Sequence, residues 1–250
     1  MLRIGSHPAW HPLFETLAYA GGYAVFRFQR ARRGDILAEP QRWTILAAAA
    51  VGALVGSRFL GIAEQFPTVL AAWHAHQLFA LLIAPGGKTI VGGLLGGWIG
   101  VELVKGLTGI RSRTGDLFAL PLCIGIAIGR IGCFLAGLAD DTYGKPTSLP
   151  WGVNFGDGIP RHPTQLYELL FLAVLGYILW KWNAKPHTNG VIFRAFMAAY
   201  LGWRLLIDFL KPQPLMHGLN MIQWACVAGL IALAAGEWRT QREVQHVRSA

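Results

Sequence analysis

Three arginines lie within stretches of sequence that otherwise have the composition of membrane-spanning helices. Arg130 is flanked by PLCIGIAIG and IGCFLAG, Arg204 lies in FMAAYLGWRLLIDFL, and Arg58 lies in AAAAVGALVGSRFLGIA. A guanidinium at bilayer depth is costly, and it must face a partner, water or an anion rather than lipid tails. These arginines therefore predict a buried site for a negatively charged group, and the most abundant anion in a membrane is a phospholipid headgroup.

Two spacings around Arg204 bear on this site. Tyr200 and Arg204 are four residues apart, as are Arg204 and Asp208. One hypothesis is a buried Arg–Asp pair that only stabilises the helix, because charges inside membranes usually pair. The alternative is that Asp208 orients the planar guanidinium of Arg204 toward a phosphate. Arg58 is either a further hydrogen-bond donor to the phosphate or paired across helices with Glu15 or Glu102.

A second group of polar residues surrounds the start of an apolar stretch at 164–182. Gln165 and Glu168 would lie on neighbouring turns of one helical face, just after Arg161 and His162. They could form a polar rim above Arg130. Alternatively, Thr164 caps the helix and Glu168 compensates its positive end.

No pattern in the sequence predicts a metal or a cofactor. Cys123, Cys133 and Cys226 lie in apolar stretches without disulfide or zinc spacing, which indicates packing residues. His74 and His76 form no metal-ligand motif. There is no glycine loop that could cradle phosphates and no nucleophile elbow.

The elements that must position these residues are predicted to be helices that cross a membrane. Of the 250 residues, 54% are hydrophobic and 14% are charged, against about a quarter charged in soluble domains. A span needs about 20 mostly apolar residues. Seven stretches qualify: 13–29, 44–63, 89–107, 115–137, 164–182, 191–209 and 219–237. The 68–84 stretch, which polar residues interrupt, is expected to be interfacial or re-entrant, and the turn-rich segment 138–163 to be an ordered loop. The prediction is an all-α membrane protein with one integral domain, 1–250.

The placement of the basic residues predicts the orientation. The net charge of +9 could suggest nucleic acid, but the basic residues cluster after alternate spans: Arg30, Arg32, Arg33 and Arg42; Lys105, Arg111 and Arg113; Lys181 and Lys185; and Arg239, Arg242 and Arg248. By the positive-inside rule the N-terminus is outside, the C-terminus is cytoplasmic and the 138–163 loop is external. The expected partner is a membrane and not a nucleic acid.

Glycines recur at helical spacing in the third predicted span, at Gly92, Gly93, Gly96, Gly97 and Gly100. Small residues four apart let helices approach closely in lipid. The functional alternative is that the missing side chains leave room beside this helix for a lipid tail or headgroup to pass.

Several segments resemble prolipoprotein diacylglyceryl transferases, in order along residues 13–237. They are VGSRF (Val55–Phe59), GGKTIVGGLLGG (Gly86–Gly97), GRIGCFLAG (Gly129–Gly137), YGKPTSLPWGVNF (Tyr143–Phe155), RHPTQLYE (Arg161–Glu168), YLGWRLLIDFLKP (Tyr200–Pro212) and GLNMIQW (Gly218–Trp224). Asp116 also fits. The family's seven spans and external N-terminus agree with the orientation above.

The resemblance implies an enzyme of the bacterial inner membrane. The family moves the diacylglyceryl group of phosphatidylglycerol onto a lipoprotein cysteine and releases glycerol phosphate. Arg130 and Arg204 would hold the phosphate. The resemblance does not assign the base, for which His162 and Glu168 are the best-placed residues of this chain. The remaining substrate-binding candidates are Arg58, Gly92, Gly93, Cys133, Gly144, Arg161, Gln165, Tyr167, Tyr200 and Asp208. No cofactor is expected.

The chain also departs from the family. Val91 stands where the family has a histidine, Cys133 where it has an asparagine, and Glu15 where it has a tyrosine; residues 139–142 resemble an insertion. These changes affect residues that would serve the acceptor, so the acceptor is either the lipoprotein thiol or another molecule. Glu15, His76, Asp140 and Asp141 are further candidates for the base. Three alternatives stay open: a non-catalytic lipid-binding or lipid-translocating paralogue, a headgroup transferase, and an anion transporter.

Overall fold

The chain is mostly helical, as the sequence predicts. A computed structural model describes residues 2–3, 10–65 and 87–249. Its long helices are α1 (Trp10–Arg33), α2 (Glu39–Glu64), α5 (Ile90–Thr108), α6 (Asp116–Ala136), α7 (Thr164–Asn183), α8 (Val191–Ile207) and α9 (Met221–Ser249). The short elements are the 3₁₀ turns η1 (Gly137–Asp140) and η2 (Asp208–Leu210) and the strands β1 (Leu2–Arg3), β2 (Val153–Asn154) and β3 (Pro160–Arg161). The stretch 68–84, expected to be interfacial, lies outside the described residues.

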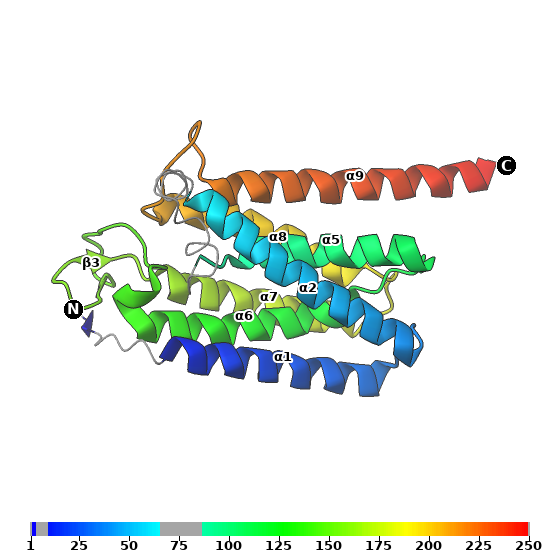
Figure 1. Cartoon of the computed structure of the whole chain (residues 1–250), viewed down its shortest axis with the longest axis horizontal. Coiled ribbons are helices and arrows are strands. Elements are labelled where there is room, and N and C mark those ends of the chain that lie inside the picture. Colours follow the sequence, from blue (N-terminus) through cyan, green and yellow to red (C-terminus); the bar gives the residue numbers. More distant parts are fainter. Residues whose placement is uncertain (1, 4–9, 66–86, 250) are drawn as a thin grey trace, which may run out of the picture. The chain divides into compact units, whose positions relative to one another are not determined.

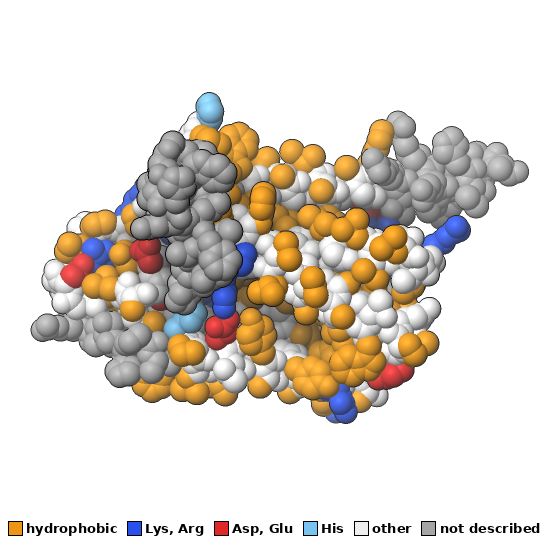
Figure 2. Space-filling model, viewed as in Figure 1, with side chains coloured by type: hydrophobic (Ala, Val, Ile, Leu, Met, Phe, Trp, Pro, Cys, Tyr) orange, Lys and Arg blue, Asp and Glu red, His pale blue; other side chains and the backbone are white. Residues whose placement is uncertain are grey.

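Among the described residues, four segments are long and apolar enough to cross a membrane: α2, α5, α6 continued by η1, and the Met221–Trp238 part of α9. They match the predicted spans 44–63, 89–107, 115–137 and 219–237. Helices α1 and α7 cover two further predicted spans but carry more polar residues, and α8 has 17 residues. Large apolar side chains are exposed along these helices, including Phe59, Leu103 and Leu107 (Figure 2). Exposed apolar surface of this extent is typical of a face that contacts lipid.

The described residues form two compact units. The first contains Met1–Ile36, Ser112–Ala199 and Phe209–Pro212, and the second contains Leu37–Arg111, Tyr200–Asp208 and Gln213–Ala250. Helix α8 contributes its first part to one unit and its last part to the other.

In the first unit, α6 packs against both α1 and α7 (Figure 1). The contact with α1 is close because glycines face the opposite helix: a Cβ at Gly132 would lie 2.4 Å from Phe14 Cβ, far inside van der Waals contact. Phe26 of α1 stacks on Phe118 of α6, with ring centroids 5.5 Å apart. In a small sheet, β2 pairs parallel to β1 and antiparallel to β3.

In the second unit, glycines bring α2 and α5 into backbone contact (Figure 1). A Cβ at Gly96 would lie 2.3 Å from the carbonyl oxygen of Gly52, and a Cβ at Gly92 would lie 2.3 Å from that of Gly56. The hydroxyl of Thr89 accepts a hydrogen bond from the Gly92 amide and so caps α5. The contact is the small-residue packing that the sequence predicts.

Two further helices begin at side-chain caps. Asp116, from the first turn of α6, accepts hydrogen bonds from the backbone amides of Gly190 (2.7 Å) and Phe193 (2.9 Å) at the start of α8. At the start of α9, the Asn220 side chain accepts from the Gln223 amide while the Gln223 side chain accepts from the Asn220 amide. This reciprocal pair satisfies two backbone donors in the manner of a capping box.

Candidate active site

Arg130 is buried in the first unit and has a carboxylate partner. Its Nε lies 3.0 Å from Glu168 Oε2, and the two side chains are 5% and 2% exposed. Arg130 comes from the penultimate turn of α6 and Glu168 from the second turn of α7, so the packing of these two helices makes the pair. Removing one member of a buried pair leaves the other charge uncompensated and is strongly destabilising.

Thr164 does not cap α7, in contrast to one sequence-based hypothesis. The residue before the helix is Pro163, which provides no side-chain cap. Thr164 instead donates its hydroxyl proton to the carbonyl oxygen of Thr142, at 2.7 Å. The polar residues at the start of α7 thus bind neighbouring side chains and the preceding loop.

That loop, between η1 and α7, contains His162, one of the predicted rim residues. Gly144 donates its amide to the carbonyl oxygen of His162, and a Cβ there would lie 2.6 Å from His162 Cβ. The Tyr167 hydroxyl accepts from Trp151 Nε1 at 2.8 Å and lies 3.3 Å from His162 Nδ1. Gly144 is therefore required for close approach, and the hydrogen bonds hold His162 at the start of α7.

Arg161 and Gln165 have different surroundings in the same unit. Arg161 pairs with Asp157 at 2.5 Å, and its guanidinium lies 4.9 Å from the ring centroid of Tyr143. Gln165 is buried and donates to Thr142 Oγ1 at 3.2 Å. Arg161 is thus held within the loop, whereas Gln165 is held against the residue that also binds Thr164.

A cluster that the sequence does not predict lies next to Arg130. Cys133 Sγ is 3.8 Å from Arg130 Nη1, and it lies close to His11 and Asp140. His11 Nδ1 is 2.5 Å from Asp140 Oδ1. Hydrogen bonds to Asp140 and, secondarily, to Cys133 raise the pKa of His11 from 6.5 to about 10. The sequence predicts Cys133 to be a packing residue, whereas the structure gives it polar neighbours.

Arg204 of the second unit is also buried beside a carboxylate. Its Nη2 donates to both oxygens of Asp208, at 2.7 and 3.1 Å, and Tyr200, one turn earlier, is fully buried. Gln223 of α9 donates to the carbonyl oxygen of Leu205 at 2.9 Å. The structure thus contains the Arg204–Asp208 pair that the spacing predicts.

The remaining candidates lie on α2 and α5. Arg58 is half-buried on α2, and Glu102, one of its proposed partners, pairs with Lys105 at 2.9 Å. Gly92 is in backbone contact with Gly56, whereas a Cβ at Gly93 would meet its nearest neighbour only at 3.7 Å. Close packing therefore accounts for Gly92 and does not account for Gly93. Val91 is fully buried.

The chain is similar in sequence to a known family of proteins. A family model described as prolipoprotein diacylglyceryl transferase matches residues 1–238. A protein of Bordetella parapertussis named phosphatidylglycerol–prolipoprotein diacylglyceryl transferase is 32% identical over 248 residues, covering 92% of this chain and 90% of that protein. Proteins of the same name from Geobacter sulfurreducens and Methylobacillus flagellatus are 31% and 34% identical, covering 84% and 76% of this chain and 80% and 72% of their own.

Proposed function

The chain belongs to the prolipoprotein diacylglyceryl transferase family, and from this premise we propose that it is a multi-pass transferase of the bacterial inner membrane. Its donor is phosphatidylglycerol, the donor in the names of its relatives. It moves the diacylglyceryl group to an acceptor, which is a lipoprotein cysteine or another nucleophile. It crosses the membrane seven times, with an external N-terminus and a cytoplasmic C-terminus.

The buried arginines carry this proposal. Arg130 and Arg204 are nearly inaccessible, and each is held by a carboxylate, Glu168 or Asp208. A guanidinium has five donors in a planar fork. The contacts with these carboxylates are made by Arg130 Nε and Arg204 Nη2. In the proposed reaction both arginines bind the phosphate, and the carboxylates orient them.

The proposed reaction breaks the C–O bond between the diacylglyceryl group and the phosphate and forms a bond from that carbon to the acceptor. Glycerol phosphate leaves, and the arginines stabilise the negative charge that develops on its oxygens. The acceptor proton goes to a base. His162 is a better candidate for the base than Glu168, because Glu168 Oε2 already lies 3.0 Å from Arg130 Nε.

The test is a transfer assay with purified protein, labelled phosphatidylglycerol and either a lipoprotein precursor peptide or a bacterial extract. Removing a single transition-state donor costs on the order of 10²–10³ in rate, so Arg130→Ala and Arg204→Ala should each reduce transfer at least that much. Arg111→Ala, at an exposed position after α5, is the matched control. Full transfer by both variants, with normal folding of each, would exclude the proposed role of these arginines.

A second candidate, a non-catalytic paralogue that binds or moves lipid, is favoured by Val91, a buried apolar residue where the family has histidine. In the same assay, mass spectrometry of labelled products separates diacylglyceryl transfer, headgroup transfer and no reaction. If Val91→His gained lipoprotein modification, the site would be otherwise intact and would have lost only the chemistry of the family's histidine. No labelled product from any acceptor would favour the paralogue.

A further inference from the structure

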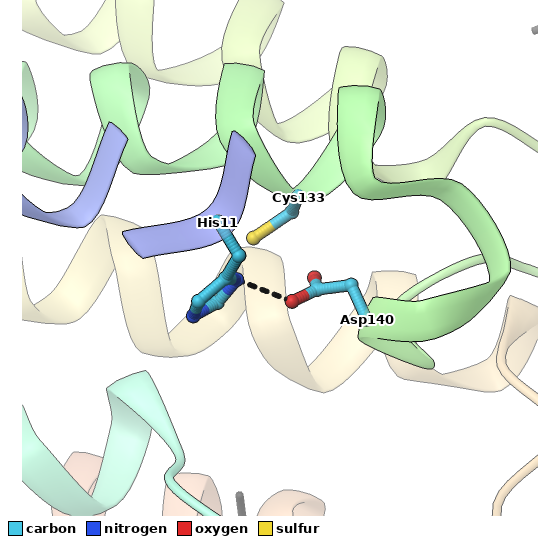
Figure 3. Close-up of side chains that lie close together, drawn as sticks. All are labelled: His11, Cys133 and Asp140. Carbon is cyan, nitrogen blue, oxygen red and sulfur yellow. Dashed lines mark ion pairs between the residues drawn. The ribbon is translucent and has the colours of Figure 1, made fainter. Parts of the chain in front are cut away.

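Three potential metal ligands converge from three separate elements of the first unit (Figure 3). His11 lies in the first turn of α1, Cys133 in the last turn of α6, and Asp140 at the end of η1. One nitrogen, one sulfur and one oxygen atom of these residues all lie within 4.8 Å of one another. The ion pair between His11 and Asp140 lies at one edge of this group.

The contacts that Asp140 and His11 make outside the cluster use the atoms that do not face the proposed ligand atoms. Thr142 Oγ1 donates to Asp140 Oδ2 at 2.7 Å, so that Oδ1 is the oxygen that faces His11. On the far side of the imidazole, His11 Nε2 lies 3.9 Å from Glu15 Oε2. The Asp140 carboxylate is thus oriented as a metal ligand typically is, through the oxygen that does not bind the ion, whereas the distance from His11 to Glu15 is too long for a hydrogen bond.

We propose that His11 Nδ1, Cys133 Sγ and Asp140 Oδ1 bind one divalent transition-metal ion of the zinc class. Zinc accepts imidazole nitrogen, thiolate sulfur and carboxylate oxygen at about 2.0–2.3 Å, and the three ligand atoms here lie within 4.8 Å of one another. The His11 side chain is 46% exposed. A fourth position is therefore open to water or another ligand, as in zinc sites with three protein ligands.

The local charges suit a divalent ion. A Cys133 thiolate and the Asp140 carboxylate together carry two negative charges, which one divalent cation neutralises. The nearby charge of Arg130 is already balanced by Glu168, at 3.0 Å. Arg130 also lies 3.8 Å from Cys133 Sγ.

The same three residue types could instead form a proton relay with Cys133 as nucleophile. Such a relay uses one imidazole nitrogen for the nucleophile and the other for the carboxylate. Here Nδ1 faces Asp140 and Nε2 faces Glu15, so the hydrogen bond of His11 to Cys133 has no nitrogen to itself. A metal ion bound by all three ligand atoms accounts for this arrangement better than a proton relay does.

The test measures metal binding directly and requires no transfer activity, so its outcome is independent of the function proposed above. The full chain is purified in detergent with a tag that lacks histidine, stripped with a chelator and titrated with Zn²⁺ or Co²⁺. One equivalent of Co²⁺ should bind and produce thiolate-to-cobalt charge-transfer absorption. Cys133→Ser should abolish that absorption. His11→Ala, a change at a half-exposed site, should weaken binding at least about 100-fold, since loss of an outer partner alone costs 10–100-fold.

Matched variants separate this site from the other cysteines and histidines. Cys123→Ala and Cys226→Ala, at buried sites outside the cluster, should bind Co²⁺ with unchanged affinity and spectrum. Thr142→Ala, which removes the hydrogen bond to Asp140, should weaken binding about 10- to 100-fold. The proposal is overturned if the stripped wild type binds no Co²⁺, or if its spectrum persists in Cys133→Ser or its affinity in His11→Ala.

Discussion

At the scale of the residue, the pairing of Arg204 with Asp208 determines how this part of the chain tolerates substitution. Both side chains are almost completely buried, at 3% and 0% exposure. Asp208→Asn keeps the shape but removes the negative charge beside the guanidinium. Breaking a buried ion pair in this way costs about 3–5 kcal/mol, and the free energy of unfolding in mixed micelles should fall by that amount.

The control for this prediction is another carboxylate-to-amide change, at an exposed position. Glu39→Gln at the start of α2 should cost less than about 1 kcal/mol, the usual contribution of an acidic residue near a helix N-terminus. Equal losses in Asp208→Asn and Glu39→Gln would contradict the view that Asp208 compensates a buried charge.

Sequence spacing could predict the Arg204–Asp208 pair, whereas it places Glu168 only in a rim above Arg130 and does not identify it as the ion-pair partner. Arg204 and Asp208 lie four residues apart, an interval that makes side chains on a helix neighbours. Glu168 reaches Arg130 only because α6 packs against α7, and no local pattern encodes that contact. His11 is a further case, since it precedes the first predicted span and meets Cys133 and Asp140 only in the folded unit.

At the scale of the element, the contact between α2 and α5 depends on the absence of side chains. A Cβ at Gly96 would lie 2.3 Å from the Gly52 carbonyl oxygen, so Gly96→Ala must separate the two backbones. Overpacking of this kind costs about 1–3 kcal/mol, and the thermal unfolding temperature of the purified protein should fall.

Gly106, on the same helix, provides the comparison. Among the described residues, no atom outside the local backbone lies within 4 Å of the place where a Cβ at Gly106 would stand. Gly106→Ala should therefore be neutral or stabilise by about 0.5–1 kcal/mol through helix propensity. If Gly96→Ala and Gly106→Ala were equally stable, the close approach of α2 and α5 would not be a determinant of stability.

The length of an apolar run predicts the most hydrophobic helices well, but it does not predict the polar contacts at the helix ends. The predicted spans 44–63, 89–107 and 115–137 lie within or close to α2, α5 and α6, because each contains a long apolar run. The predicted span 191–209 begins where α8 begins, at Val191, but the side-chain cap at that start could not be predicted from the local sequence. This cap depends on Asp116, which lies 74 residues before Gly190 in the sequence.

At the scale of the whole molecule, the proposed orientation can be tested with reporter fusions. Green fluorescent protein fused after Gly109 or Ala250 should fluoresce, because both positions are proposed to be cytoplasmic. Alkaline phosphatase fused after Gly156, in the proposed external loop, should be active. An active phosphatase after Ala250, or a fluorescent fusion after Gly156, would reverse the orientation or change the number of crossings.

Helix α9 is longer than a bilayer requires. Its 29 residues extend roughly 43 Å at 1.5 Å per residue, against ~30 Å of hydrocarbon, and its apolar part ends at Trp238. The surplus turns carry Arg239, Arg242 and Arg248 in the sequence. Basic residues next to a membrane surface attract acidic lipids by about 1 kcal/mol each. With the proposed cytoplasmic C-terminus, these residues would concentrate acidic lipids beside the helix, and the proposed donor phosphatidylglycerol belongs to that class of lipid.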